Sequence, residues 1–292
     1  MLLKKKRKGI ILAGGTGSRL FPITKSVSKQ LVPLYDKPMI YYPLTTLMNA
    51  GITEFLIITN LDHLYAFKKL IGNGKQFGIS VSYAIQKQPN GIAEAFIIGE
   101  DFIKNDPVAL ILGDNLFYGD QLDNILKNIS DDEKGGIIFA YSVSNPQDYG
   151  VAEFDDNFNV LNIFEKPRNP SSNWAITGLY FYDNTIIDKA KSIKPSLRGE
   201  LEITDLNLIF LKEKSLKVEL MKPGTTWLDT GNPDSLHDAG SYIRTLEKRQ
   251  GIKVGCPEET AFKLGLINKD NLEILSNDLI KTSYGKYLQT LL

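Results

Sequence analysis

The amino-acid sequence predicts an α/β protein built on a doubly wound, mostly parallel mixed sheet, and three observations support this class. Short apolar runs, typical of buried strands, recur in the first half at residues 9–14, 54–59, 80–86 and 108–114. Helical patterns separate these runs, which favours a parallel sheet covered by helices on both faces. The middle of the chain is rich in strand-like segments and turns, which indicates an added β-rich region.

The elements are expected in the following order. Residues 37–51 form a helix that ends at Gly51, and further helices follow at 62–71 and 92–103. Later strands are expected at 135–143, 150–154, 160–166, 174–183 and 216–221. From Pro233 onward the chain is mostly helical, and residues 233–250 form the longest helix. We therefore expect a core of residues 1–240, with a C-terminal helical segment of residues 241–292 packed on it.

Composition and charge exclude several classes of function. The chain has 34 Lys and Arg against 34 Asp and Glu, so no long-range field indicates a nucleic acid or a membrane as partner. Cys256 is the only cysteine and there are two histidines, which excludes an intramolecular disulfide and disfavours a zinc site. The basic run at residues 4–8 is interpreted as a solvated tail, and without an apolar leader the protein is expected in the cytoplasm.

A glycine loop follows the first strand. Gly14, Gly15 and Gly17 let the backbone N–H groups approach an anion. Neither the dinucleotide fingerprint nor the Walker A motif fits, because Leu20 stands where the former needs glycine and the Gly-Lys-Ser/Thr ending of the latter is absent. Arg19 and Lys29 remain as cations suited to a polyphosphate leaving group. The alternative is a plain turn with Arg19 in a surface ion pair.

Two acids are expected at strand ends. Asp114 closes the run at 108–114, and Asp229 follows the strand at 216–221. Together they could hold Mg²⁺, which typically takes one or two carboxylates plus water and substrate phosphate oxygens. The alternative is that each acid caps a turn. Glu165, Lys166, Arg198 and Trp227 are further candidates for a sugar phosphate site, against the alternatives of surface ion pairs and core packing; they are found in "FEKP", "RGELEITD" and "TTWLDTG".

The motifs together resemble one family. The opening segment "GIILAGGTGSRLFPITKSVSKQLVPLYDKPMIYYPL" is similar to that of bacterial glucose-1-phosphate thymidylyltransferases, and the resemblance continues through "NGIAEAFIIGE", "LILGDNLFYG", "ITGLYFYD", "RGELEITDLN" and "RQGIKVGCPEE". It covers nearly the whole chain after residue 8. It implies a Rossmann-like nucleotidyltransferase fold with a sugar-binding β-rich insertion. It also implies synthesis of dTDP-glucose from dTTP and glucose 1-phosphate with Mg²⁺, as the first step toward dTDP-rhamnose.

The resemblance also implies residue roles. For the nucleotide, it implies that the loop residues Gly14, Gly15 and Gly17 approach it, that Arg19 binds the departing pyrophosphate, that Lys29 contacts the phosphates, and that the thymine edge is read by Gln86 and Gly91. For the metal, it implies that Asp114, which also contacts the nucleotide, holds the ion together with Asp229. For the sugar phosphate, it implies a pocket lined by Tyr149, Gly150, Glu165, Gly178 and Trp227, with the phosphate bound by Lys166 and Arg198. A homotetramer is implied, with a regulatory nucleotide-sugar site at a subunit interface that includes residues 251–259.

Three rival interpretations stay open at this point. A dinucleotide-dependent oxidoreductase is disfavoured because the strand at 54–59 ends in Thr59 and not in an acid that could bind a ribose. A sugar-nucleotide sensor without catalysis is disfavoured by the intact set of cations and acids. The same reaction with UTP is the nearest rival, since uracil differs from thymine by one methyl group, worth only ~1–3 kcal/mol of discrimination.

Overall fold

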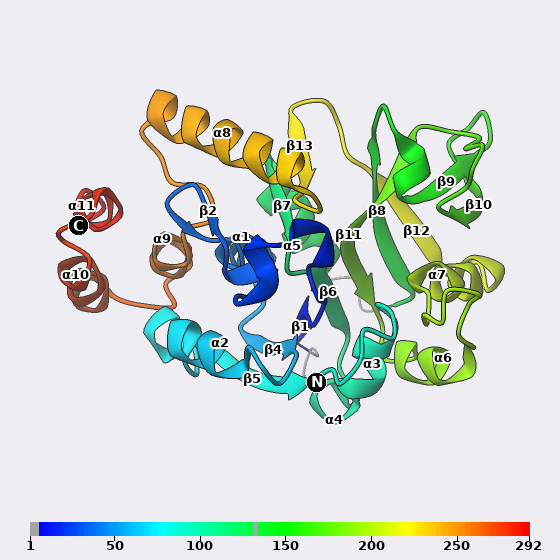
Figure 1. Ribbon diagram of the computed structural model, residues 1–292, viewed down its shortest axis with the longest axis horizontal. Helices are drawn as coiled ribbons and strands as arrows, with labels where there is room; N and C mark the ends of the chain where they lie inside the picture. The colour runs from blue at the N-terminus through cyan, green and yellow to red at the C-terminus, as the bar shows by residue number, and fades with distance from the viewer. Residues whose placement is uncertain (1–5, 131–133) are drawn as a thin grey trace.

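The computed structural model describes residues 6–130 and 134–292, and within them the chain folds around a nine-stranded mixed sheet (Figure 1). Neighbouring strands follow the order β10-β9-β11-β6-β1-β4-β5, and β8 pairs with both β11 and β12. The strands are β1 (Lys8–Ala13), β4 (Glu54–Thr59), β5 (Ser80–Ile85), β6 (Val108–Leu112), β8 (Gly136–Ser142), β9 (Gly150–Phe154), β10 (Val160–Glu165), β11 (Trp174–Tyr182) and β12 (Leu216–Leu220). The α/β class with a mostly parallel mixed sheet is therefore confirmed.

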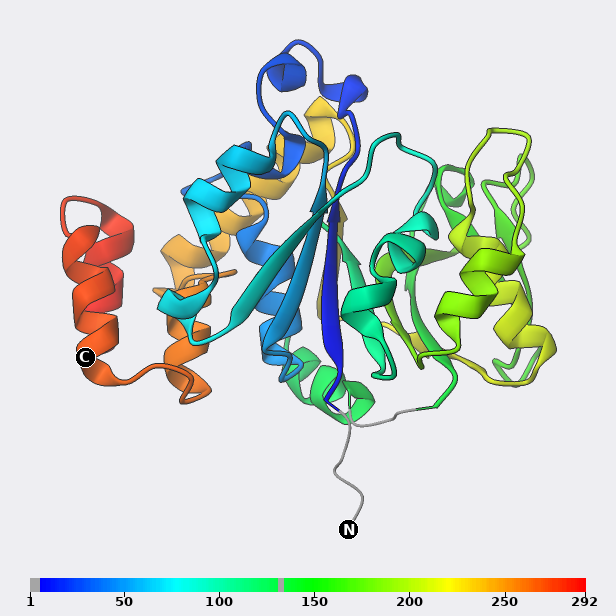
Figure 2. The ribbon, with the colours of Figure 1, turned by 90° about the horizontal axis from the view of Figure 1, so that it is seen from below.

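The parallel half consists of β5, β4, β1 and β6, whose strands all begin within one residue of their predicted positions. β1 lies at its centre, with β4 on one side and β6 on the other (Figure 2). Its alternate side chains enter separate cores on the two faces of the sheet: Ile11 belongs to one cluster and Ile10 to the other. Both residues are fully buried, which explains why the strand is apolar on both faces.

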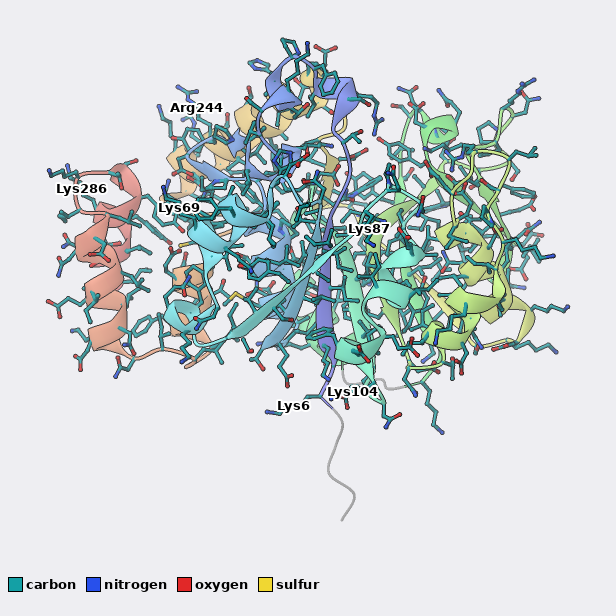
Figure 3. The ribbon with its side chains drawn as sticks, turned by 60° about the horizontal axis from the view of Figure 1, so that its bottom comes forward. Lys6, Lys69, Lys87, Lys104, Arg244 and Lys286 are labelled. Atoms are coloured by element: carbon teal, nitrogen blue, oxygen red, sulfur yellow. The ribbon has the colours of Figure 1, made fainter. Side chains whose placement is uncertain are left out.

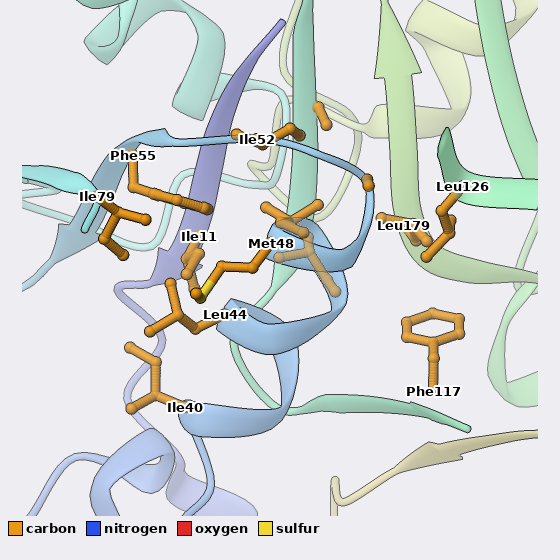
Figure 4. Close-up of a cluster of buried hydrophobic side chains, with 14 of the residues drawn as sticks. Ile11, Ile40, Leu44, Met48, Ile52, Phe55, Ile79, Phe117, Leu126 and Leu179 are labelled. Carbon is orange, nitrogen blue, oxygen red and sulfur yellow. The ribbon is translucent and has the colours of Figure 1, made fainter. Parts of the chain in front are cut away.

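Helix α1 (Tyr41–Asn49) covers one face of this half. Figure 4 shows Leu44 and Met48 of α1 beside Ile11 of β1 in the larger core cluster. The helix begins later than predicted because Lys37–Pro38 (β3) pairs with Pro33–Leu34 (β2) in a small hairpin. Residues 37 and 38 are therefore extended and cannot be helical.

The helix predicted at 92–103 is interrupted at Gly99, which separates α3 (Glu94–Ile98) from α4 (Glu100–Ile103). A Cβ built on Gly99 would lie 3.0 Å from Cδ1 of Ile10. The glycine thus allows the helical layer to approach β1 closely. The remaining helices are α2 (Leu64–Ile71), α5 (Leu122–Ser130), α6 (Ile186–Ser192), α7 (Ile203–Lys212), α8 (Pro233–Gln250), α9 (Pro257–Lys263), α10 (Lys269–Asp278) and α11 (Ser283–Gln289).

The long strand β11 joins the parallel half to the β-rich region. Its second part pairs antiparallel with β6, with Leu179 opposite Ile111, and its first part meets β9 at Ala175. β8 pairs antiparallel with both parts of β11, with an irregularity between Ile176 and Tyr180. A separate two-stranded ribbon, β7 (Asn115–Gly119) with β13 (Thr225–Asp229), was not predicted. Neither strand has the apolar run that identified the others.

The C-terminal helices agree with the prediction, and α8 spans the 233–250 segment. An Asn232 capping box and Pro233 begin α8, and Gly251 ends it in a left-handed conformation. Helix α8 continues across residues 240 and 241, where the predicted core ends and the predicted C-terminal segment begins. The division of the chain into these two parts stays a prediction. Helices α10 and α11 pack on each other at one end of the molecule (Figures 1 and 2). In residues 6–130 and 134–292, no helix has the length and apolar character needed to cross a membrane.

The interpretation of residues 4–8 as a solvated tail is wrong where the structure describes them. Residues 4 and 5 lie outside the described part. Arg7, however, is only 6% exposed, and its guanidinium donates hydrogen bonds to the carbonyls of Val108 (3.0 Å) and Tyr182 (2.8 Å). Lys8 already belongs to β1. Only Lys6 keeps a clearly exposed position, at the amino end of the sheet with Lys104, whereas Lys87 follows β5 at the carboxyl end (Figure 3).

Candidate active site

The glycine loop lies at the carboxyl end of β1, the edge at which sheets of this type bind ligands. Gly17 has a left-handed backbone (φ 63°), and the Thr24 hydroxyl donates a 2.7 Å hydrogen bond to the Gly17 carbonyl. A Cβ built on Gly17 would lie 3.2 Å from the Thr24 side chain, so a larger residue would be both strained and crowded. The loop leads into a short 3-10 helix, Ser18–Leu20, that carries the exposed Arg19.

Two cavities meet beside this loop. The first, the loop cavity, has a volume of about 340 Å³, and its walls include Gly15, Gly17, Arg19, Lys29 and Asp114. The second, the sheet cavity, has a volume of about 220 Å³, and its walls include Tyr149, Gly150, Glu165, Lys166, Gly178, Arg198, Trp227 and Asp229. Arg19, Asp114 and Glu200 line both cavities. The structure thus brings cations and acids from distant parts of the chain to one place.

The two predicted aspartates meet through the unpredicted ribbon. The sequence analysis placed Asp229 after the strand at 216–221, which is β12. In the structure Asp229 instead ends a separate strand, β13. Because β13 pairs antiparallel with β7, Asp229 lies opposite Asn115, and Asp114 is the residue before Asn115. The hydroxyl of Thr230 donates a 2.9 Å hydrogen bond to the Asp114 carbonyl, which ties the ends of the two strands together.

Positive charge surrounds these carboxylates. Lys29 is only 5% exposed, and its ammonium forms an ion pair with Asp114. Burial and the neighbouring charge of Asp114 raise the pKa of Asp229, while the charge of Lys29 opposes this shift. Gly231 leaves room for the convergence, since a Cβ built on it would lie 3.1 Å from Asp229 Oδ2 and 3.2 Å from Arg19 Nη2.

Asn115 connects the acids to the sheet cavity, and the sequence analysis missed it. Its side-chain oxygen accepts hydrogen bonds from Trp227 Nε1 (2.6 Å) and Gly178 N (3.1 Å), and its Nδ2 donates to Asp114 Oδ1 (3.1 Å). The residue is 2% exposed. A Cβ built on Gly178 would lie 2.5 Å from Asn115 Oδ1, so glycine is needed beside it. The only signal in the sequence was its position after Asp114.

Aromatic side chains form one wall of the sheet cavity. The rings of Tyr149 and Trp227 meet at 5.1 Å between centroids in an edge-to-face arrangement. Trp227 also belongs to the larger core cluster and is 6% exposed. It is therefore both a core residue and part of the cavity wall. Lys166, which lines the same cavity, has a left-handed backbone (φ 42°) and is exposed. The Lys166 N–H donates to the Tyr149 carbonyl (3.1 Å), which places these two residues side by side.

Arg198 lines the sheet cavity but is bound to carboxylates. Its guanidinium donates to Glu165 Oε1 (2.8 Å) and to both oxygens of Glu202 (3.2 and 2.8 Å). Thr204 donates to the other oxygen of Glu165 (2.6 Å). Glu202 and Thr204 were not predicted, because nothing in the local sequence separates them from ordinary surface polar residues.

Three predicted residues lie outside the described walls of both cavities. Gly14, Gln86 and Gly91 form a group behind the glycine loop, where Gln86 Nε2 donates to the Gly91 carbonyl (3.3 Å) and Gln86 Oε1 lies against Gly14. Gly91 has φ +107°, and a Cβ built on it would lie 2.4 Å from the Leu201 carbonyl oxygen. The group is adjacent to the loop cavity through Gly15 and Pro89, which line it.

A further cavity of about 230 Å³, the helix cavity, lies between α1, β7 and the segment from Ile252 to Lys263. Its walls include Thr45, Thr46, Tyr118, Lys253, Cys256 and Lys263. No described residue lines both the helix cavity and either of the other two. Part of the segment predicted as a regulatory site, residues 251–259, therefore borders a separate cavity.

Comparisons with known proteins show the family of the chain. The family model described as nucleotidyl transferase matches residues 8–245. Curated glucose-1-phosphate thymidylyltransferases from Neisseria meningitidis and Mycolicibacterium smegmatis are each 53% identical to this chain over 285 residues, which cover 98% of this chain and 99% of each relative.

Solved structures are similar over most of the fold. A crystal structure from Bacillus anthracis, described as a glucose-1-phosphate thymidylyltransferase in complex with a sucrose, has a TM-score of 0.76 and 41% identity, covering 82% of this chain and 95% of that one. A UDP-glucose pyrophosphorylase complexed with UDP-glucose has a TM-score of 0.72 and 26% identity, covering 82% of this chain and 99% of the other.

Proposed function

Because the chain belongs to the nucleotidyl transferase family and, within it, to the glucose-1-phosphate thymidylyltransferases, we propose that the loop cavity and the sheet cavity hold the two substrates of that reaction. The reaction transfers the thymidylyl group of dTTP to glucose 1-phosphate and yields dTDP-glucose and pyrophosphate. In this assignment the triphosphate lies along the glycine loop and the sugar phosphate enters the sheet cavity. The observation that carries it is the shared wall, because Arg19 and Asp114 line both cavities.

The reaction is a direct displacement. A phosphate oxygen of glucose 1-phosphate forms a bond to the α-phosphorus of dTTP as the bond to pyrophosphate breaks. A phosphate monoester, with a second pKa of ~6, is largely dianionic at neutral pH, so no side chain needs to remove a proton. Positioning and fixed positive charge must do the rest. Arg19 takes the departing pyrophosphate, Lys29 contacts the phosphates, and Lys166 guides the sugar phosphate.

The sugar ring takes the remaining walls of the sheet cavity. Tyr149 and Trp227 offer an apolar surface to one face of the ring, and Glu165 accepts hydrogen bonds from its hydroxyls. Gly150 and Gly178 keep the space free of side chains. Arg198 adds positive charge near the sugar phosphate, and its bonds to Glu165 and Glu202 fix the direction of its guanidinium.

Enzymes of this family generally use a divalent metal, and Asp114 with Asp229 is the set that fits one. Two carboxylates suit Mg²⁺, which usually keeps water and takes its other ligands from substrate phosphates. Burial and the charge of Asp114 raise the pKa of Asp229 although Lys29 opposes the shift, so a cation held between the two carboxylates would favour their ionised forms. When bound, the ion neutralises charge on the α-phosphate. Asn115 and Lys29 hold the carboxylate of Asp114 in place.

Pyrophosphate release tests the proposal. The purified chain, mixed with dTTP, glucose 1-phosphate and Mg²⁺, should release pyrophosphate and dTDP-glucose in equal amounts. Omitting the sugar phosphate should abolish release. UTP in place of dTTP tests the nearest rival, and NADH titration followed by fluorescence tests the oxidoreductase. Release that does not depend on glucose 1-phosphate would refute the assignment of the sheet cavity.

The helix cavity supports a second part of the proposal, a regulatory site for a nucleotide sugar in a homotetramer. Its walls combine an aromatic ring, Tyr118, with the cations Lys253 and Lys263, a mixture that suits a base and a diphosphate. The ammonium of Lys253 already pairs with Asp36 and Glu247, so Lys263 is the more available cation. Lys263 is well exposed, with 69% of its side chain accessible, although it pairs with Glu259.

Inhibition by dTDP-sugars tests the regulatory site. A dTDP-deoxysugar should inhibit the wild-type chain without competing with glucose 1-phosphate, and Lys263→Glu should weaken that inhibition at least about tenfold while leaving the uninhibited rate unchanged. Light scattering on the purified chain tests the tetramer. Inhibition that is competitive and insensitive to Lys263→Glu would refute the site.

A further inference from the structure

The side-chain amide of Gln86 is held in one orientation. Gln86 follows β5 directly and is only 3% exposed. Its Nε2 donates to Glu94 Oε2 (2.8 Å) and to the carbonyl of Gly91 (3.3 Å). An ionised carboxylate and a backbone carbonyl only accept hydrogen bonds, so the NH₂ group must occupy this side. The carbonyl oxygen of the amide is therefore fixed on the other side.

That oxygen points toward the glycine loop. A Cβ built on Gly14 would lie 2.3 Å from Gln86 Oε1, closer than real Cβ atoms approach a neighbour. Only glycine at position 14 leaves room for the amide in this orientation. Gly15 and Pro89, on either side, line the loop cavity. Gln86 thus directs a hydrogen-bond acceptor, and no donor, toward Gly14 of the glycine loop, next to the cavity assigned to the nucleotide.

The carboxylate of Glu94, which holds Gln86, is itself fixed by further hydrogen bonds. Its second oxygen, Oε1, accepts a 2.8 Å hydrogen bond from Asn90 Nδ2. The Asn90 carbonyl in turn accepts from Leu201 N (2.7 Å), and the Leu201 carbonyl accepts from Ala93 N (3.2 Å). Both carboxylate oxygens are therefore engaged, and the loop that carries them is fastened to the segment after Arg198.

We propose that Glu94 is a positioning residue that sets base selectivity: by fixing the amide of Gln86 as an acceptor, it makes the site choose pyrimidines that carry a hydrogen on N3. This inference rests on the proposed function, in which Gln86 meets the base. Thymine and uracil have an N3–H donor, whereas N3 of cytosine is an acceptor. Opposite Gln86 Oε1, cytosine would bring two acceptors together and leave both unpaired, which costs binding free energy.

The variant Glu94→Gln tests this inference. A glutamine at 94 both donates and accepts, so only the longer contact to the Gly91 carbonyl (3.3 Å) still holds the amide of Gln86 in its orientation. The amide can then turn and present Nε2 to cytosine in part of the molecules. The ratio of kcat/KM for dTTP over dCTP should fall at least about tenfold, mainly because dCTP improves. The ratio for dTTP over dUTP should not change, since both bases carry the N3 hydrogen. A loss of structure alone would lower all three values together.

Glu100→Gln is the matched control. Glu100 begins the adjacent helix α4 and pairs with Lys191 at an exposed position, with 48% and 44% of the two side chains accessible. This variant should leave both ratios at their wild-type values. If Glu94→Gln does not fold, Glu94→Ala, which also frees the amide, should lower the same ratio.

The possible results distinguish the role of Glu94 from the proposed function. A wild-type dTTP over dCTP ratio in both variants at position 94, with dTTP still a good substrate, would overturn the role of Glu94 and leave the proposed function standing. An equal fall in both nucleotide ratios would also overturn it. A wild-type chain that releases no pyrophosphate from dTTP would refute the proposed function, and this inference with it.

Discussion

Alanine at Gly178 should damage the protein far more than alanine at Gly150, although both glycines lie on strands and line the sheet cavity. A Cβ on Gly178 would lie 2.5 Å from Asn115 Oδ1 and 2.7 Å from Leu112 Cδ1. A Cβ on Gly150 would meet no neighbour closer than 3.5 Å, which is ordinary contact. The two substitutions add the same methyl group to the same cavity wall, so they form a matched pair.

The expected cost follows from these contacts. Overpacking of a buried site costs about 1–3 kcal/mol of unfolding free energy. Displacing Asn115 also weakens its hydrogen bonds to Gly178 N and Trp227 Nε1, at about 0.5–1.5 kcal/mol each. The total for Gly178→Ala is about 2–6 kcal/mol, which corresponds to a fall in Tm of roughly 3–10 °C for a chain of this size. Gly150→Ala should change stability by no more than about 0.5 kcal/mol.

Thermal unfolding followed by circular dichroism measures this difference, and pyrophosphate release measures its effect on the site. Because Asn115 also holds Asp114, Gly178→Ala should lower kcat along with Tm. The double variant Gly178→Ala/Asn115→Ala should cost less than the sum of the two single changes, since the clash with Asn115 Oδ1 is gone while the one with Leu112 Cδ1 remains. Equal Tm values for Gly178→Ala and Gly150→Ala would refute the reasoning from Asn115.

The remaining predictions concern charge and burial. Arg19→Ala should lower kcat by roughly 10²- to 10³-fold, as loss of one transition-state donor does in other enzymes, and a near-normal steady-state rate would contradict its role. Asp229→Asn should raise the Mg²⁺ concentration needed for half-maximal rate without lowering Tm, because burial and Asp114 already disfavour the ionised form; an unchanged Mg²⁺ titration would contradict the metal assignment. Burial raises the pKa of the Cys256 thiol, so iodoacetamide at pH 8 should label it slowly in the folded chain and quickly in urea, and fast labelling of the folded chain would show that the burial is wrong. Burial alone would raise the pKa of Asp36, but Lys37 and Lys253 overcome it and lower the pKa. The stability that Asp36 contributes is therefore present above pH ~4 and lost as the pH falls through its lowered value, so Asp36→Asn should be less stable than wild type at pH 7 and equal to it near pH 2 in urea titrations.

What could be predicted from sequence is what depends on local signals. The strands around Ile11 and Ile57 were found because they are buried on both faces and hence apolar throughout. Helix α8 was predicted with its observed bounds, and Asn232, Pro233 and Gly251 are local signals that mark these ends. The glycine loop and its Arg19 were found because a run of glycines after a strand has few structural uses.

What was missed depends on contacts between distant segments. The ribbon of β7 and β13 joins residues more than 100 positions apart, and its short strands carry no pattern of their own. Asn115 matters only because that ribbon brings it to Trp227. Arg7 was interpreted as part of a tail because nothing in the local sequence reveals that its guanidinium donates hydrogen bonds to the carbonyls of Val108 and Tyr182.

A crystal structure of the chain with dTDP-glucose bound tests the central claim most directly. We expect the thymine beside Gln86, the glucose between Tyr149 and Glu165, and the diphosphate at the wall shared by the two cavities, within reach of Asp114. A product bound in one cavity only, or at a place where residue 114 touches no phosphate, would contradict the account.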